Sequence, residues 1–190
     1  AFRWPANPAI RKGVIVDRQV ENLDIMPTIL ALVARLSAHD RRTRGHAERV
    51  RVYTDMIAEE MKLDEGDRYR LRWAALLHDI GKLGIPDRIL CKPGRLTPEE
   101  RSVMEQHPTL AFEMLEPIAF LRPALDIPHG HHERWDGAGY PRGLQGTMIP
   151  PAARLFSVVD VWDSLRHTRP YKPAWSVDDS RRFIQSGRGT

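Results

Sequence analysis

Histidine and aspartate side chains are the residues of this sequence with the most evident chemistry. His78 and Asp79 are consecutive inside the most apolar stretch of the chain, which predicts burial on nearly every side. A buried carboxylate needs a cation or several hydrogen bonds, because burying an unpaired charge is very costly. A second polar pair, His131 and His132, stands at the start of a glycine-rich segment, and Asp160 lies in another apolar segment. This pattern favours a bound metal ion.

A single histidine of this kind is more often an ordinary core or surface residue than a metal ligand. The set is harder to explain in that way, since five of the eight histidines, His46 and His107 among them, fall at predicted helix boundaries or apolar faces. Five imidazoles and two carboxylates are enough ligands for two ions. The only cysteine, Cys91, cannot form an internal disulfide or a thiolate site. Imidazole and carboxylate ligands favour iron, manganese or nickel, and zinc is less favoured in a six-coordinate site with a shared carboxylate.

Helices must position these side chains, because apolar residues recur at intervals of three and four along most of the chain. Asp64 and Ser176 are predicted N-caps, and Thr97 begins a capping box with proline at the first helical position. The predicted helices cover residues 23–39, 50–61, 64–82, 97–107, 110–116, 120–125, 155–162 and 176–184. The predicted class is all-α, a compact helical bundle of about seven helices with an ordered glycine-rich loop over residues 128–151.

The composition is that of one globular domain. The chain has 190 residues, of which 42% are hydrophobic and 28% charged, which excludes a disordered or collagen-like chain. No apolar stretch approaches the ~20 residues that cross a bilayer, so we expect no membrane span and a cytoplasmic location. The net charge of +4 suits an anionic substrate. Because no run of five Lys or Arg occurs, DNA binding is not expected.

Two motifs carry a resemblance to a known family. HDIGK begins at His78 and HHERWDGAGYP begins at His131, and the segments 43–50, 85–96, 107–108, 153–165 and 169–172 add to them. Together they resemble an HD-GYP domain, a subgroup of the HD phosphohydrolases associated with cyclic di-GMP breakdown. The resemblance extends from about residue 38 to residue 171.

This resemblance implies a site with two metal ions. The implied ligands of the first ion are His46, His78, Asp79 and Asp160, and those of the second are His107, His131 and His132, with Asp79 bridging the two. Some members of the family hold a third ion through a glutamate four residues before the first histidine, and here Arg42 stands at that place. We therefore expect two divalent ions, iron or manganese before nickel or zinc, and not three.

The activity implied by the resemblance is hydrolysis of a phosphodiester by a hydroxide that bridges the two ions. For cyclic di-GMP the product is pGpG, with GMP as a further product. Asp79 and Lys82 are the expected catalytic residues, and Lys82, Arg169 and Lys172 are the expected phosphate contacts. Without the resemblance, Lys82 is a solvated lysine at a helix end, and residues 169–172 are a turn after a helix.

Two other functions stay open at this point. The first is hydrolysis of another cyclic dinucleotide such as cyclic GMP-AMP, because the sequence does not locate the residues that distinguish guanine from adenine. The second is a signalling module without catalysis, which binds a cyclic dinucleotide while the loop of Gly139, Tyr140 and Pro141 docks a diguanylate cyclase domain. The retained ligand set argues against this second alternative.

Three further residues have expected supporting roles. Glu133 is expected to orient a ligand imidazole, and Asp163 to hold a neighbouring arginine or cap a helix rather than bind metal. Tyr140, followed by Pro141, should shape the rim of the cleft or a docking surface, and is a poor candidate for proton transfer.

The two ends of the sequence give the expected domain boundaries. Residues 1–18 are predicted to be a linker that follows a regulatory domain outside this sequence. Residues 19–190 are predicted to form the HD-GYP domain, truncated at its C-terminus. A homodimer through the first helix is a further expectation, although no sustained heptad supports it.

Overall fold

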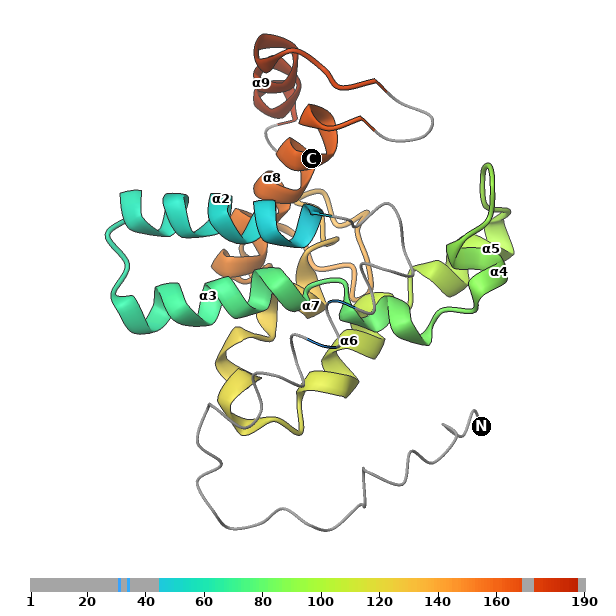
Figure 1. The fold of residues 1–190 in the computed structure, drawn as a ribbon, viewed down its shortest axis with the longest axis horizontal. Helices are drawn as coiled ribbons and strands as arrows, with labels where there is room; N and C mark the ends of the chain where they lie inside the picture. Colours follow the sequence, from blue (N-terminus) through green and yellow to red (C-terminus); the bar gives the residue numbers. More distant parts are fainter. Residues whose placement is uncertain (1–30, 32–33, 35–44, 169–172, 188–190) are drawn as a thin grey trace.

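The computed structural model describes residues 31, 34, 45–168 and 173–187 (Figure 1). Within these residues no strand forms, and the only β pairing is an isolated bridge between Asp136 and Gln145. The helical elements in order are α2 (His46–Glu60), α3 (Glu65–Leu77), η1 (Ile80–Gly84), α4 (Asp87–Leu90), α5 (Pro98–Met104), α6 (His107–Leu115), η2 (Ala119–Ala124), α7 (Asp126–Gly130), η3 (Gly146–Met148), α8 (Pro151–Arg166) and α9 (Val177–Ser186). The predicted all-α class is confirmed.

The predicted helix starts are confirmed where the capping residues lie in described segments. The Asp64 side chain accepts a hydrogen bond from the backbone N–H of Asp67 at the start of α3. Thr97 and Glu100 form the reciprocal capping box of α5. Ser176 caps α9 in the same manner as Asp64 caps α3. Local sequence therefore decided where these helices begin, because each cap satisfies backbone donors that lack a partner within the helix.

The prediction of a continuous helix over residues 64–82 is wrong. The α-helix α3 ends at Leu77, and the chain continues through His78 and Asp79 into the 3₁₀ helix η1. Gly81 in η1 lies so close to α6 that a Cβ there would stand 1.9 Å from the backbone oxygen of His107. Neighbouring residues on one α-helix point about 100° apart. The change of helix type at Asp79 lets His78 and Asp79 face the same centre.

The boundaries around Pro108 also differ from the prediction. The helix that starts at Thr97 ends at Met104, before reaching His107. A new helix, α6, begins at His107 with Pro108 in its first turn, where a missing backbone N–H costs nothing. The predicted helix over residues 120–125 is replaced by the 3₁₀ helix η2, which covers Ala119–Ala124. The new start at His107 makes this histidine the first residue of its helix.

The core lies where α2 and α3 pack side by side, with α7 and α8 across them (Figure 1). Its fully buried residues include Val50, Ala75, Ile127 and Phe156, one from each of these helices. A second apolar cluster joins the C-terminal half of α3 to α6 and η2. These two apolar clusters fix the ends of α2, α3, α6 and α7 relative to α8, and a buried histidine stands at each of those ends.

Part of the predicted organisation lies outside the described residues. This holds for the linker 1–18, for the helix 23–39 apart from residues 31 and 34, and for the positions of Arg42, Arg169 and Lys172. Among the helices that are described, none combines the length and the apolar character needed to cross a bilayer.

Candidate metal centre

The first cluster of polar side chains is formed by the ends of α2 and α3 and the middle of α8. His46 is the first residue of α2 and His78 directly follows α3, and both are buried. The Nε2 atoms of these two histidines lie 3.3 Å apart. Asp160 of α8 places Oδ1 3.4 Å from His46 Nε2. Ligand atoms of His46, His78 and Asp79 all lie within 4.8 Å of one another, which is close enough for one ion.

A second cluster of three histidines stands beside the first. His107 begins α6, and His131 and His132 directly follow α7. The Nε2 atoms of His107 and His131 lie 3.3 Å apart, and the His132 ring centroid is 5.0 Å from that of His107. His107 and His131 are buried, with 1% and 3% of their surface exposed. Ligand atoms of the three histidines also lie within 4.8 Å of one another.

Asp79 lies between the two clusters, and its two carboxylate oxygens face different ones. Oδ2 is 3.3 Å from His78 Nε2, while Oδ1 is 3.4 Å from His107 Nε2 and 3.9 Å from His131 Nε2. Lys82 Nζ donates a hydrogen bond of 2.6 Å to Oδ2. The carboxylate is 6% exposed. A single buried carboxylate is therefore placed to serve both clusters.

The outer nitrogen of four histidines is fixed by a hydrogen bond. His78 Nδ1 donates to the backbone oxygen of Ala75. In the same way His107 Nδ1 donates to the backbone oxygen three residues before it, and His131 Nδ1 to those three and four residues before it. His46 Nδ1 donates to the Asp163 carboxylate over 2.7 Å. A neutral imidazole with its hydrogen on Nδ1 keeps the lone pair on Nε2. All four histidines thus direct Nε2 toward the centre.

The electrostatics of the second cluster suit metal ligands. Burial lowers the pKa of His107 to about 4, with help from the positive charges of Lys82 and His132. Burial and neighbouring imidazoles also hold the pKa of His131 well below its usual range. Both rings are therefore neutral near pH 7, and two Nε2 lone pairs face each other across 3.3 Å. Two acceptors at this distance need a cation between or beside them.

The first cluster favours a cation for a different reason. Burial alone would lower the pKa of His78, but the charge of Asp79 and a hydrogen bond to it, supported by Asp160, raise that pKa. Burial would raise the pKa of Asp79, but the charges of Lys82 and His78 keep it well below the usual value. Asp79 is therefore ionised near pH 7. The same negative charge that raises the pKa of His78 would attract a divalent ion to His78 Nε2.

Two carboxylates outside the clusters differ in role. Asp163 accepts two hydrogen bonds from Arg49 and also orients the imidazole of His46. The prediction that it holds an arginine is confirmed. Glu133 does not contact an imidazole through a hydrogen bond among the described residues; it accepts from the backbone N–H groups of Arg142 and Leu144, both at 2.8 Å. The prediction for Glu133 is wrong, because its side chain points into the following loop.

Arg49 is a residue that the sequence analysis missed. It lies three residues after His46, on the same side of α2, and places Nε 2.6 Å from Asp163 Oδ1. A spacing of three residues on a helix is the signal that could have linked it to His46. The third partner of Asp163, His167, follows it by four residues on α8 and places Nδ1 3.1 Å from Oδ1.

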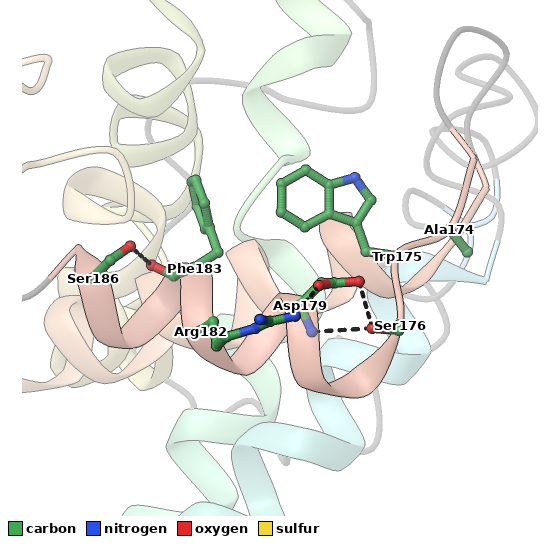
Figure 2. Close-up of a pocket in the computed structure, with 7 residues that line it drawn as sticks. All are labelled: Ala174, Trp175, Ser176, Asp179, Arg182, Phe183 and Ser186. Carbon is green, nitrogen blue, oxygen red and sulfur yellow. Dashed lines mark hydrogen bonds and ion pairs between the residues drawn. The ribbon is translucent and has the colours of Figure 1, made fainter.

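A separate open pocket of about 660 Å³ lies at the C-terminal end of the described chain (Figure 2). It is lined only by residues 174–186, among them Trp175 and Phe183, whose rings meet edge to face at 5.6 Å. None of its lining residues belongs to either histidine cluster. The pocket in Figure 2 is therefore not the candidate metal centre.

The sequence of the chain matches a known protein family. The HD domain family matches residues 31–190, which include both clusters and Asp79. The chain belongs to the HD domain family. The adjacent His78 and Asp79 are the pair that gives an HD domain its name, and the GYP sequence after His132 agrees with the HD-GYP subgroup.

Relatives of this HD domain are cyclic dinucleotide phosphodiesterases by name. A cyclic di-GMP phosphodiesterase of Thermotoga maritima is 44% identical over 171 residues, covering 87% of this chain and 46% of the relative. The cyclic di-GMP phosphodiesterase response regulator RpfG of Xanthomonas campestris is 40% identical over 85% of this chain and 43% of its own. This HD domain therefore spans less than half the length of these curated relatives.

A solved structure resembles this HD domain as well. It is the crystal structure of a cyclic GMP-AMP specific phosphodiesterase of Vibrio cholerae, V-cGAP3, with a TM-score of 0.53 and 30% sequence identity. The match covers 88% of this chain and 37% of that protein.

Proposed function

We propose that this HD domain is a metal-dependent phosphodiesterase that hydrolyses cyclic di-GMP to pGpG and, in a second step, to GMP. The observation that carries the proposal is the position of Asp79, whose two oxygens face two separate clusters of inward-directed imidazoles. The names of the relatives from Thermotoga maritima and Xanthomonas campestris support cyclic di-GMP as the substrate.

We assign two divalent ions to the centre, and the donor set fits them. His46, His78 and Asp160 would hold the first ion, His107, His131 and His132 the second, and Asp79 both. Imidazole and carboxylate ligands without thiolate favour iron or manganese, with nickel next and zinc less suited. When bound, such ions activate water and stabilise charge on phosphoryl oxygens.

The chain's own residues would bind and orient the substrate. The Lys82 ammonium lies 2.6 Å from Asp79 Oδ2, so a phosphate group at the centre would be within its reach. A positive charge held there stabilises the negative charge that develops on the phosphoryl and leaving oxygens. We assign Arg169 and Lys172 as further phosphate contacts, on the resemblance of their segment to the family, since both lie outside the described residues.

Tests of this proposal begin with metal content. Protein purified without oxygen and reconstituted with iron or manganese should hold two ions per chain and linearise cyclic di-GMP. Asp79→Ala should lose both the ions and the activity, because it removes the shared ligand, whereas the exposed Asp136→Ala should keep both. Equal metal content in wild type and Asp79→Ala would contradict the bridging role.

Lys82 gives a second test that separates substrate handling from metal binding. Lys82→Ala should keep both ions and raise KM or lower kcat for cyclic di-GMP, because a phosphate-binding charge is lost. The matched control is Lys92→Ala, whose lysine pairs with Glu100 and belongs to neither histidine cluster. Loss of metal from Lys82→Ala would show that the lysine supports the ligands instead.

Cyclic GMP-AMP is the alternative substrate, and the similarity to V-cGAP3 favours it specifically. Turnover of cyclic di-GMP and 3′3′-cyclic GMP-AMP by the same reconstituted protein, measured side by side, decides between them. Binding of either nucleotide without turnover would favour a signalling module without catalysis. The cytoplasmic location, the homodimer and the diguanylate cyclase partner stay predictions.

A further inference from the structure

His132 differs from the other four histidines of the centre. Among the described residues, neither of its ring nitrogens has a hydrogen-bond partner, whereas the other four each fix Nδ1 in this way. The surroundings of His132 are aromatic instead. Its ring centroid lies 4.1 Å from that of His131 and 4.7 Å from that of Tyr140, and the planes of His132 and Tyr140 are tilted by 31°.

The Tyr140 ring is carried on a loop that is bound tightly to the residues around His132. The backbone N–H of Tyr140 donates to the His132 carbonyl over 3.2 Å. Glycine is required at position 139, because a Cβ there would lie 2.3 Å from the backbone nitrogen of Arg134. This close approach brings the Tyr140 ring over the His132 imidazole.

A buried carboxylate holds the far side of the same loop. The side chain of Glu133 has no exposed surface and accepts from the backbone N–H groups of Arg142 and Leu144. Arg142 directly follows Pro141, and Leu144 lies two residues further along the loop. The position of Tyr140 is thus fixed on both sides, by His132 before it and by Glu133 after it.

We propose that Tyr140 is a positioning residue for His132 and keeps its imidazole in place by ring stacking. The other four histidines are held instead by a hydrogen bond at Nδ1. The inference rests on the proposed metal centre and adds to it the role of the GYP loop. Offset or tilted ring pairs attract each other beyond their buried area. Loss of an outer partner of a metal-bound histidine typically costs about 10- to 100-fold in metal affinity, and we expect about tenfold here.

The test compares metal binding by Tyr140→Phe and Tyr140→Leu. Metal-free protein is titrated with Mn²⁺ without oxygen, and bound metal is measured by elemental analysis. Tyr140→Phe should bind two ions as wild type does, because the ring is kept. Tyr140→Leu should keep one ion and bind the other about tenfold more weakly. Trp135→Leu is the control, because it also replaces an aromatic ring by leucine in the same loop, but at a ring that packs under Arg154.

Several outcomes would overturn the inference. Equal binding of both ions by Tyr140→Leu and wild type would show that stacking does not matter, and equal weakening in Tyr140→Phe would assign the role to the hydroxyl. If Tyr140→Leu does not fold, Glu133→Gln decides instead. The new side-chain amide NH₂ would face one of the two backbone N–H groups that Glu133 now accepts from, which should loosen the loop that carries Tyr140. The affinity for the ion held by His132 should then fall, and unchanged affinity for both ions would refute the inference. Wild type that binds no Mn²⁺ would overturn the proposed function itself, and this inference with it.

Discussion

Replacement of Asp163 by alanine should destabilise the metal-free protein strongly. The Asp163 side chain is 2% exposed and receives hydrogen bonds from His46 Nδ1 and from Nε and Nη2 of Arg49, at 2.7, 2.6 and 2.9 Å. Breaking a buried ion pair by removing one partner costs about 3–5 kcal/mol. Because the Arg49 side chain is 32% exposed and can regain water, we expect the lower end of this range, about 3 kcal/mol.

The measurement is equilibrium unfolding in urea at pH 7, with chelator present. Asp163→Asn should lose about half as much free energy of unfolding as Asp163→Ala, roughly 1.5 kcal/mol, because the amide oxygen still accepts one of the hydrogen bonds. The control is Asp178→Ala on the exposed surface of α9, where the ion pair with Arg181 spans 3.8 Å. An exposed pair of this kind contributes at most about 1 kcal/mol.

The stabilisation that Asp163 provides should be lost as the pH falls. Burial raises the pKa of Asp163, but hydrogen bonds from His46 and Arg49 outweigh it and hold the pKa far below the usual value. A lowered pKa stabilises the fold above the unfolded pKa of about 3.9, and the benefit falls as the pH drops toward the folded pKa. The difference between wild type and Asp163→Ala should therefore shrink below about pH 4. A difference under about 1 kcal/mol at pH 7, or one that grows on acidification, would refute this reasoning.

Three further predictions concern the scaffold around the centre. Gly81→Ala should destabilise by at least about 2 kcal/mol in urea unfolding, because its Cβ would stand 1.9 Å from the His107 carbonyl oxygen. Thr54→Val should stabilise by about 1 kcal/mol in the same assay, since Oγ1 of Thr54 is buried with no hydrogen-bond partner among the described residues. In an NMR titration the Asp136 carboxyl should titrate near pH 2, because hydrogen bonds from Arg134 and the Ala138 backbone N–H lower its pKa to about 2. Arg134→Gln should move this midpoint up toward ~3.9, and an unchanged midpoint would contradict the pairing.

The sequence alone determined the residue types of the centre and most of its local scaffold. The caps at Asp64, Thr97 and Ser176 act on backbone groups within three residues, so local sequence suffices to predict them. The adjacent His78 and Asp79 in an apolar stretch also signalled a buried charge that needs a partner. Helix class followed from the spacing of apolar residues, because that spacing matches the period of the α-helix.

Helix ends and supporting contacts were predicted less well, for reasons that involve distant parts of the chain. The end of α3 at Leu77 depends on the close approach of Gly81 to α6, which no local pattern contains. The role of Glu133 could not be assigned from residue type, since a carboxylate beside two histidines is equally suited to orient an imidazole. Its actual partners, the backbone N–H groups of Arg142 and Leu144, depend on the direction in which the side chain leaves its own element.

Only the tertiary structure decided which groups share the centre. His46 and Asp163 meet across 117 residues of sequence because α2 packs against α8, and the side of each helix that faces the other is set by burial of Val50 and Phe156. The division of the Asp79 oxygens between the two histidine clusters has the same origin. Apolar packing chooses the relative placement of the helices, and the polar side chains at their ends are brought together as its consequence.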